Sequence, residues 1–74
     1  MMTLASKRKL EKQRRAQIKQ SMERLAAIDT ALMSAYMTFD NISDPVLTDA
    51  CIYEINALRS RRSSVIRELR GIYG

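Results

Sequence analysis

The stretch ISDPVLTDACIYEINAL, residues 42–58, decides the fold, because it joins a polar turn to a regular helical pattern. Ser43 and Asp44 are turn-forming residues, and Pro45 lacks the backbone N–H that would go unpaired at the first position of a helix. We therefore predict that a helix starts at Pro45, with Asp44 as its N-cap and Ser43 as the alternative cap.

The segment after Pro45 carries a stripe at spacings of three and four residues, which is typical of helices that pack as antiparallel pairs. The stripe consists of Leu47, Cys51, Ile55, Leu58, Arg62, Val65, Leu69 and Ile72. We predict a second helix over residues 45–70, with a last turn that frays at Gly71.

Working back from the turn, residues 4–37 contain no Pro or Gly, which favours one long first helix. Its apolar stripe is Ile18, Met22, Leu25, Leu32, Tyr36 and Phe39, with Asp29 at the gap. A second apolar set lies off that stripe and comprises Ala26, Ile28, Ala31, Met33 and Met37. We predict that this helix ends at about residue 38, that the turn covers residues 39–44, and that the helix is buried on more than one side.

A short turn makes the two helices antiparallel neighbours and pairs Leu32 with Cys51. In this alignment Arg14 and Arg15 come opposite Leu69, so the apolar end of the second helix has no apolar match. That end comprises Val65, Ile66, Leu69, Ile72 and Tyr73. Arginine stems cover part of such a surface, and we expect a second chain to cover the rest.

These patterns predict an all-α fold, an antiparallel two-helix hairpin that forms a homodimeric four-helix bundle with coiled-coil packing. The residues expected in the core or interface are Leu25, Leu32, Met33, Tyr36, Phe39, Leu47, Cys51, Ile55, Leu58, Val65, Leu69 and Ile72. The competing prediction is a monomeric hairpin that binds a different, unidentified partner protein.

Length and composition agree with one small helical domain, since the chain has 74 residues with only 2 Gly and 1 Pro. The net charge of +5 is uneven, because residues 7–19 hold seven Lys/Arg and one Glu. We therefore predict a basic helical extension over residues 1–17 and the hairpin over residues 18–74, and fraying of the extension stays open.

Three features favour a cytoplasmic protein. Cys51 is the only cysteine, which suits a reducing compartment. The first residues, MMTLASKRKLEK, lack the long apolar core of a secretory signal, and we expect no signal there. No apolar run approaches the roughly 20 residues that a membrane-spanning helix needs.

One set of residues carries a resemblance to a known family. It comprises Phe39, Ile42, Asp44, Pro45, Leu47 and Asp49, the run IYEINAL at residues 52–58, and Arg61. With this set the chain resembles the YaaL-like family of short bacterial proteins of unknown function, over about half its length. It departs from the family at Arg62 and Ser64, where the family has aromatic residues, and it lacks the family's tryptophan on the first helix. The resemblance implies a two-helix cytoplasmic protein and supplies no catalytic residues.

The residues needed for common active sites are missing. The chain has no His, one Cys and no glycine-rich phosphate loop. We predict no enzyme activity, no catalytic residue, no metal and no cofactor. Asp29 and Glu54 come near each other in the hairpin alignment, where two carboxylates could share a proton or hold a cation. The interpretation we favour is that each reaches water or an arginine of a partner chain.

Helix two also presents a polar face. Asp49, Tyr53 and Asn56 share it and could form a recognition surface. The interpretation we favour is structural, with Asp49 serving the helix start and Tyr53 packing its ring while its hydroxyl finds a partner. Cys51 lies on the apolar stripe, and we expect it to act as a small hydrophobic residue.

The basic segment is the strongest candidate for a binding role. Its cations are Lys7, Arg8, Lys9, Lys12, Arg14, Arg15 and Lys19. They could neutralise phosphates with a strong salt dependence, but no aromatic residue precedes Tyr36, so base stacking is not expected. The alternatives are a solvated extension, an acidic protein, or an anionic membrane, for which Leu4, Leu10 and Ala16 form a poor apolar face.

The sequence thus predicts a small non-enzymatic helical interaction or assembly protein that self-associates or binds a partner protein. The alternative is a nucleic-acid-associated protein whose basic segment contacts phosphates without sequence preference.

Overall fold

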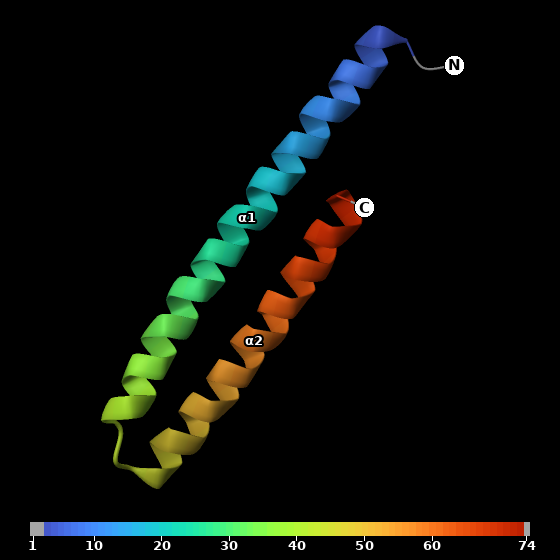
Figure 1. Ribbon diagram of the computed structural model, residues 1–74. Coiled ribbons are helices and arrows are strands. Elements are labelled where there is room, and N and C mark those ends of the chain that lie inside the picture. The colour runs from blue at the N-terminus through green and yellow to red at the C-terminus, as the bar shows by residue number, and fades with distance from the viewer. Residues whose placement is uncertain (1–2, 74) are drawn as a thin grey trace.

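The computed structural model describes residues 3–73, which form two long helices joined by a short loop (Figure 1). Helix α1 spans Leu4–Asn41 and helix α2 spans Pro45–Tyr73. The helices are antiparallel and pack against each other, and residues 3–73 contain no strand. They form a rod of 62 × 15 × 13 Å. The prediction of an all-α fold with two paired helices is confirmed.

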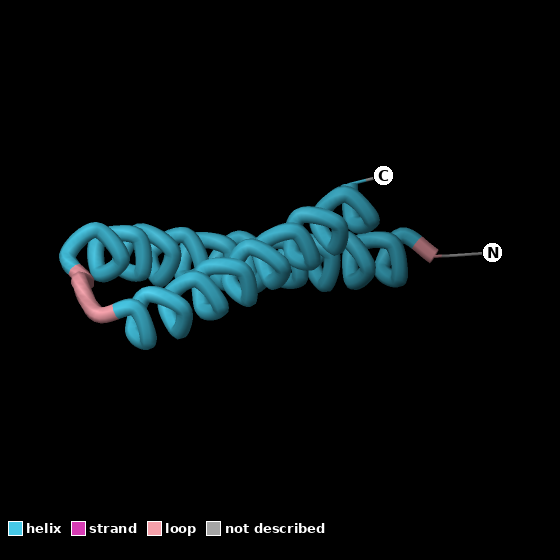
Figure 2. Tube along the Cα trace, turned by 90° about the horizontal axis from the view of Figure 1, so that it is seen from below, coloured by secondary structure: helices cyan, strands magenta, loops and turns pink. Residues whose placement is uncertain are grey.

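The two helices differ in length, so the start of α1 projects beyond the end of α2 (Figure 1). Helix α1 has 38 residues and α2 has 29, a difference of about 14 Å at 1.5 Å per residue. Figure 2 shows the start of α1 and the end of α2 at the end of the rod opposite the loop. The projecting part of α1 carries the first half of the basic segment.

Helix α1 begins with a capping threonine just before the basic segment. The hydroxyl of Thr3 accepts a hydrogen bond of 3.1 Å from the backbone N–H of Ser6, and its carbonyl oxygen accepts one of 3.0 Å from the N–H of Lys7. These bonds pair N–H groups that a helix start leaves open. The extension predicted over residues 1–17 is therefore the helical start of α1, apart from residues 1–2, which lie outside the described part.

The loop covers residues 42–44 and is shorter than the predicted turn over residues 39–44. The Oδ1 atom of Asp44 accepts a 2.8 Å hydrogen bond from the backbone N–H of Val46. Asp44 therefore acts as the N-cap of α2, and Pro45 occupies the first helical position, where a missing N–H costs nothing.

Helix α1 ends at Asn41, about one turn later than the predicted end near residue 38. The hydroxyl of Thr38 donates to the carbonyl oxygen of Ser34 at 3.0 Å, and the side-chain amide of Asn41 donates to that of Met37 at 2.8 Å. These polar side chains bond to the helix itself, so they do not compete with it. For that reason the turn-forming residues before the loop stay helical.

Helix α2 also extends beyond its predicted end at Arg70 and continues through Gly71 to Tyr73. The guanidinium of Arg14, on α1, donates a 2.9 Å hydrogen bond to the carbonyl oxygen of Ile72. The last carbonyl groups of a helix have no partner within it. Because α1 is the longer helix, it supplies one such partner from outside and supports the last turn of α2.

The core is a single seam between the helices. Its buried apolar residues are Leu32 and Ala35 on α1, and Cys51, Ile55, Leu58, Val65 and Leu69 on α2. In α2 they recur at spacings of three and four residues, as in two helices packed with a left-handed twist. Ser21, with 2 % of its surface exposed, lies in the same seam.

The seam uses a different face of α1 from the predicted stripe. Met22 and Tyr36 belong to that stripe, but both are exposed, whereas Ser21 and Ala35 are buried. The buried line follows the small residues because they let the two helix backbones approach closely. The prediction was wrong here because it ranked side chains by hydrophobicity alone.

The predicted lack of cover over the end of α2 is also wrong in part. Val65 and Leu69 are buried within the single chain, and only Tyr73 is strongly exposed. Ser21 donates a hydrogen bond to Glu68, so this turn of α2 lies against Ser21 and not against Arg15. The alignment therefore differs from the predicted one, and no second chain is needed to bury Val65 and Leu69.

Candidate functional site

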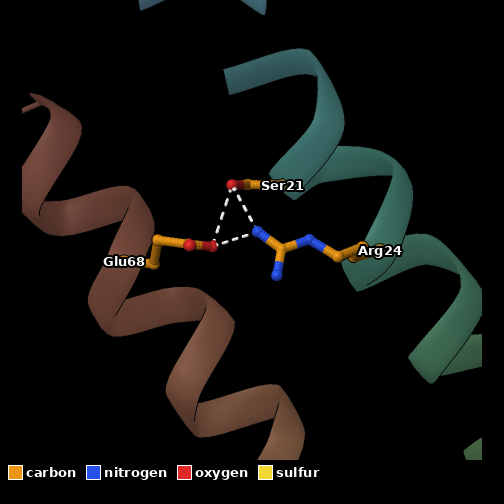
Figure 3. Close-up of polar contacts among 3 residues, drawn as sticks. All are labelled: Ser21, Arg24 and Glu68. Carbon is orange, nitrogen blue, oxygen red and sulfur yellow. Dashed lines mark hydrogen bonds and ion pairs between the residues drawn. The ribbon is translucent and has the colours of Figure 1, made fainter. Parts of the chain in front are cut away.

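A polar cluster links the two helices on one side of the seam (Figure 3). Ser21 donates a 3.0 Å hydrogen bond to Oε2 of Glu68, and Arg24 donates one of 3.1 Å to the Ser21 hydroxyl. Arg24 also forms an ion pair with the same Glu68 oxygen. The buried serine therefore has both a donor and an acceptor as partners, so its burial carries no unpaired polar atom. The cluster fixes how the helices are aligned.

A second polar contact crosses the seam nearer the loop. The Nε atom of Arg62 lies 2.7 Å from Oδ1 of Asp29. Arg62 is eight residues, or about 12 Å of helix, beyond Glu54. The expected proximity of Asp29 and Glu54 is therefore wrong, because the alignment brings an arginine of the same chain to Asp29. In residues 3–73 no three Cys, Asp or Glu side chains gather closely enough to hold a metal ion.

The other residues considered for chemistry separate into buried and exposed ones. Cys51 is buried, and its thiol donates to the carbonyl oxygen of Ala35 at 3.3 Å, so it packs in the core. Asp49, Tyr53 and Asn56 lie on the surface of α2. Tyr53 is 76 % exposed, so the favoured interpretation, in which its ring packs, does not hold within a single chain.

The predicted core and interface residues divide into three groups. The buried ones are Leu32, Cys51, Ile55, Leu58, Val65 and Leu69. Leu25 and Ile72 are half-buried. The exposed ones are Met33, Tyr36, Phe39 and Leu47. The exposed group lies toward the loop, so a single hairpin leaves its apolar side chains uncovered there.

All seven cations of the basic segment are exposed, but they do not share one face of α1. Arg14 turns toward the end of α2, where it bonds to Ile72. Four others, here called the basic stripe, recur at spacings of four, three and four residues: Arg8, Lys12, Arg15 and Lys19. At about 100° per residue the stripe lies roughly 100–160° around α1 from Arg14, away from α2. Glu11 is its near acidic neighbour, 3.9 Å from Arg15.

The same outward face of α1 becomes apolar toward the loop. Its next residues at spacings of three and four form what we call the apolar stripe: Met22, Ala26, Thr30, Met33 and Met37. All five are exposed, Met33 to 67 %. The hydroxyl of Thr30 donates to the carbonyl oxygen of Ala26 at 3.0 Å, so its hydrogen bond is made within the helix. One long outer face thus carries four cations and then a set of apolar side chains.

Sequence analysis found every cation of the basic stripe but not the face on which they lie. It also missed Ser21 as a buried residue, because a lone serine between Gln20 and Met22 has no apolar signal. The one available signal was spacing, since Ser21 lies three residues after Ile18 and four before Leu25.

No protein family, no curated protein and no solved structure matches this chain. The resemblance to the YaaL-like family stays a prediction. Neither helix of the described residues combines the length and the hydrophobicity needed to cross a membrane.

Proposed function

We propose that this chain is a small, non-enzymatic assembly protein that binds a second copy of itself through the apolar stripe of α1. The observation that carries the proposal is the exposure of three methionines on one face of α1, at Met22, Met33 and Met37. A hairpin of two helices has one seam, and this face lies outside it. Contiguous exposed apolar surface of this kind marks interaction sites in small proteins.

The chemistry of the stripe suits a helix partner. Methionine side chains are flexible and fill irregular gaps between packed helices. Spacings of three and four residues match the pattern with which one helix packs along another. Two hairpins joined at this face would form the four-helix bundle predicted from the sequence, with the two α1 helices adjacent. The single cysteine, buried in the core, supports a cytoplasmic location for this assembly.

The test is the dependence of thermal unfolding on protein concentration. A chain that associates only when folded unfolds at a higher temperature as its concentration rises. We expect this rise for the wild type and its loss in the double variant Met33→Gln and Met37→Gln. The matched control is Val46→Gln with Tyr53→Gln, which removes two exposed apolar side chains from α2 and should keep the rise.

A midpoint of the wild type that stays constant over a wide concentration range would contradict self-association. If the midpoint is constant and the methionine variant no longer retains a protein from a cell extract that the wild type retains, the partner is a different protein. Both outcomes overturn the homodimer.

We propose nucleic-acid binding as the second candidate function, because the basic stripe forms a free, continuous cationic face. It covers about 16 Å of helix, and half of it lies on the part of α1 that projects beyond α2 (Figure 1). The stripe faces away from α2, and Leu10 and Ile18 are not part of it. A membrane surface would need apolar residues beside the cations, so a phosphate backbone is the better match.

This candidate is tested by titrating labelled duplex DNA and RNA at several salt concentrations. Four phosphate contacts predict a slope of log affinity against log salt of about −3.6, and Arg8→Gln with Lys12→Gln should reduce it to about −1.8. The control Arg59→Gln with Arg67→Gln removes the same charge from α2 and should leave the slope unchanged. Equal effects of both pairs, or tight binding to anionic vesicles alone, would contradict the proposal.

A further inference from the structure

The order of residues along the apolar stripe specifies how two copies can pair, given the self-association proposed above, on which this inference rests. We infer that the two α1 helices pair antiparallel, with the two-fold axis between Asp29 and Thr30. In this arrangement Lys19 of each copy faces the partner's Asp40. The surface is therefore an isologous interface, in which the same patch serves both copies.

The apolar residues are distributed evenly about that axis. Met22 and Met37 lie at equal distances from it along the sequence, and so do Ala26 and Met33. Antiparallel pairing about the axis therefore brings Met22 to the partner's Met37, and Ala26 to the partner's Met33. A small residue opposite a long one leaves room for the longer side chain, as when a knob of one helix fills a hole in the other.

Opposite charges lie at the two ends of the apolar stripe. Lys19 precedes Met22 by three residues, and Asp40 follows Met37 by three residues. Both side chains are exposed, and neither has an ion-pair partner within residues 3–73. The axis that pairs the methionines therefore also pairs these charges, twice in each dimer. The contact would extend over about 32 Å, from Lys19 to Asp40.

Antiparallel pairing also keeps the basic stripes apart. In a parallel pair each basic stripe would lie along its own copy, and like charges at this distance repel. In the antiparallel pair the two stripes project from opposite ends of the assembly. The charge pattern of α1 therefore selects a second copy in the antiparallel direction.

A charge exchange tests this arrangement, with dimer dissociation measured by sedimentation velocity. Lys19→Glu places two like-charge pairs in the dimer and should weaken it about tenfold, since each cross-helix charge pair changes the free energy by up to about 1 kcal/mol. Asp40→Lys should weaken it similarly. The double variant Lys19→Glu with Asp40→Lys restores both pairs and should return to within about threefold of the wild type. Lys9→Glu makes the same charge change away from the stripe and should leave the dimer unaffected.

A cysteine crosslink gives an independent reading that does not depend on charge. Thr30→Cys lies beside the axis and should form an intermolecular disulfide under mild oxidation. Met37→Cys should not, because antiparallel pairing separates the two copies of residue 37 by about 22 Å along the helix. The wild type serves as the control, because its only cysteine, Cys51, is buried.

The outcomes distinguish this inference from the function on which it rests. A wild type that sediments as a monomer at every concentration overturns both. A wild-type dimer that is unaffected by Lys19→Glu, or that the double variant fails to restore, overturns the antiparallel arrangement alone. Crosslinking of Met37→Cys as fast as Thr30→Cys would indicate a parallel pair and would overturn it as well.

Discussion

Helix α1 has two faces with the same spacing and opposite character. Toward α2 it presents Ser21, Leu32 and Ala35, which are buried and include two small residues. Away from α2 it presents the apolar stripe, which has three exposed methionines and no polar contact to another helix. The inner face is narrow and is aligned by the Ser21, Arg24 and Glu68 cluster. The comparison teaches that spacing marks a face able to pack, whereas side-chain size and polar contacts decide which partner it accepts.

The largest expected difference between the faces is in the free energy of unfolding. Leu58→Ala removes a buried side chain opposite the inner face and should cost about 2–5 kcal/mol. Met33→Ala, on the outer face, should change the stability of the dilute chain by less than about 0.5 kcal/mol. Urea unfolding followed by circular dichroism measures both. If Leu58→Ala fails to fold, Ile55→Val should still cost about 0.5–1.5 kcal/mol. Equal costs on the two faces would contradict the assignment of the seam.

A sharper comparison uses two adjacent residues that lie on different faces. Ser21→Leu forces a large side chain between closely packed backbones and should cost about 1–3 kcal/mol. Met22→Leu replaces one exposed apolar residue by another of similar size and should cost almost nothing in the dilute chain. Thermal unfolding of both variants under the same conditions measures the difference. A Ser21→Leu variant as stable as Met22→Leu would show that Ser21 does not lie in the seam.

The smallest expected difference concerns the two ion pairs of α1 that lie near these faces. Asp29→Asn weakens a 2.7 Å contact across the seam to Arg62 and should cost up to about 1 kcal/mol. Glu11→Gln weakens a 3.9 Å contact along α1 to Arg15 and should cost no more than about 0.3 kcal/mol. Chemical denaturation at low and high salt measures both. A larger cost for Glu11→Gln would reverse the ranking.

Local chemistry was sufficient to predict the hairpin. Asp44 caps α2 and Pro45 starts it, because a carboxylate before a proline has few other roles at a helix start. The buried residues of α2 also follow the predicted stripe, apart from Leu47, which is exposed. A strong turn signal followed by a regular stripe leaves little choice to tertiary structure.

The alignment of the helices was not predictable in the same way. The loop is shorter than expected because Thr38 and Asn41 bond within α1, and this moves every residue of α2 relative to α1. The move brings Asp29 to Arg62 and Ser21 to Glu68. Local residue preferences do not report such contacts, which depend on where the second helix lies.

The candidate interaction surface has a similar history. The sequence contains all the cations and methionines that form it, but their face becomes clear only when Arg14 and Ser21 are known to point toward α2. Only then can Lys19, Met22 and Met33 be assigned to the opposite side. The exposure of the methionines follows from that assignment and not from their composition.

The most direct test of the central claim is the mass of the wild-type chain by light scattering over a wide concentration range. We predict a mass that rises toward twice the 8.5 kDa of one chain as concentration increases. A fully helical protein that keeps the mass of one chain at the highest concentration would contradict the claim that the outer face of α1 binds a second copy.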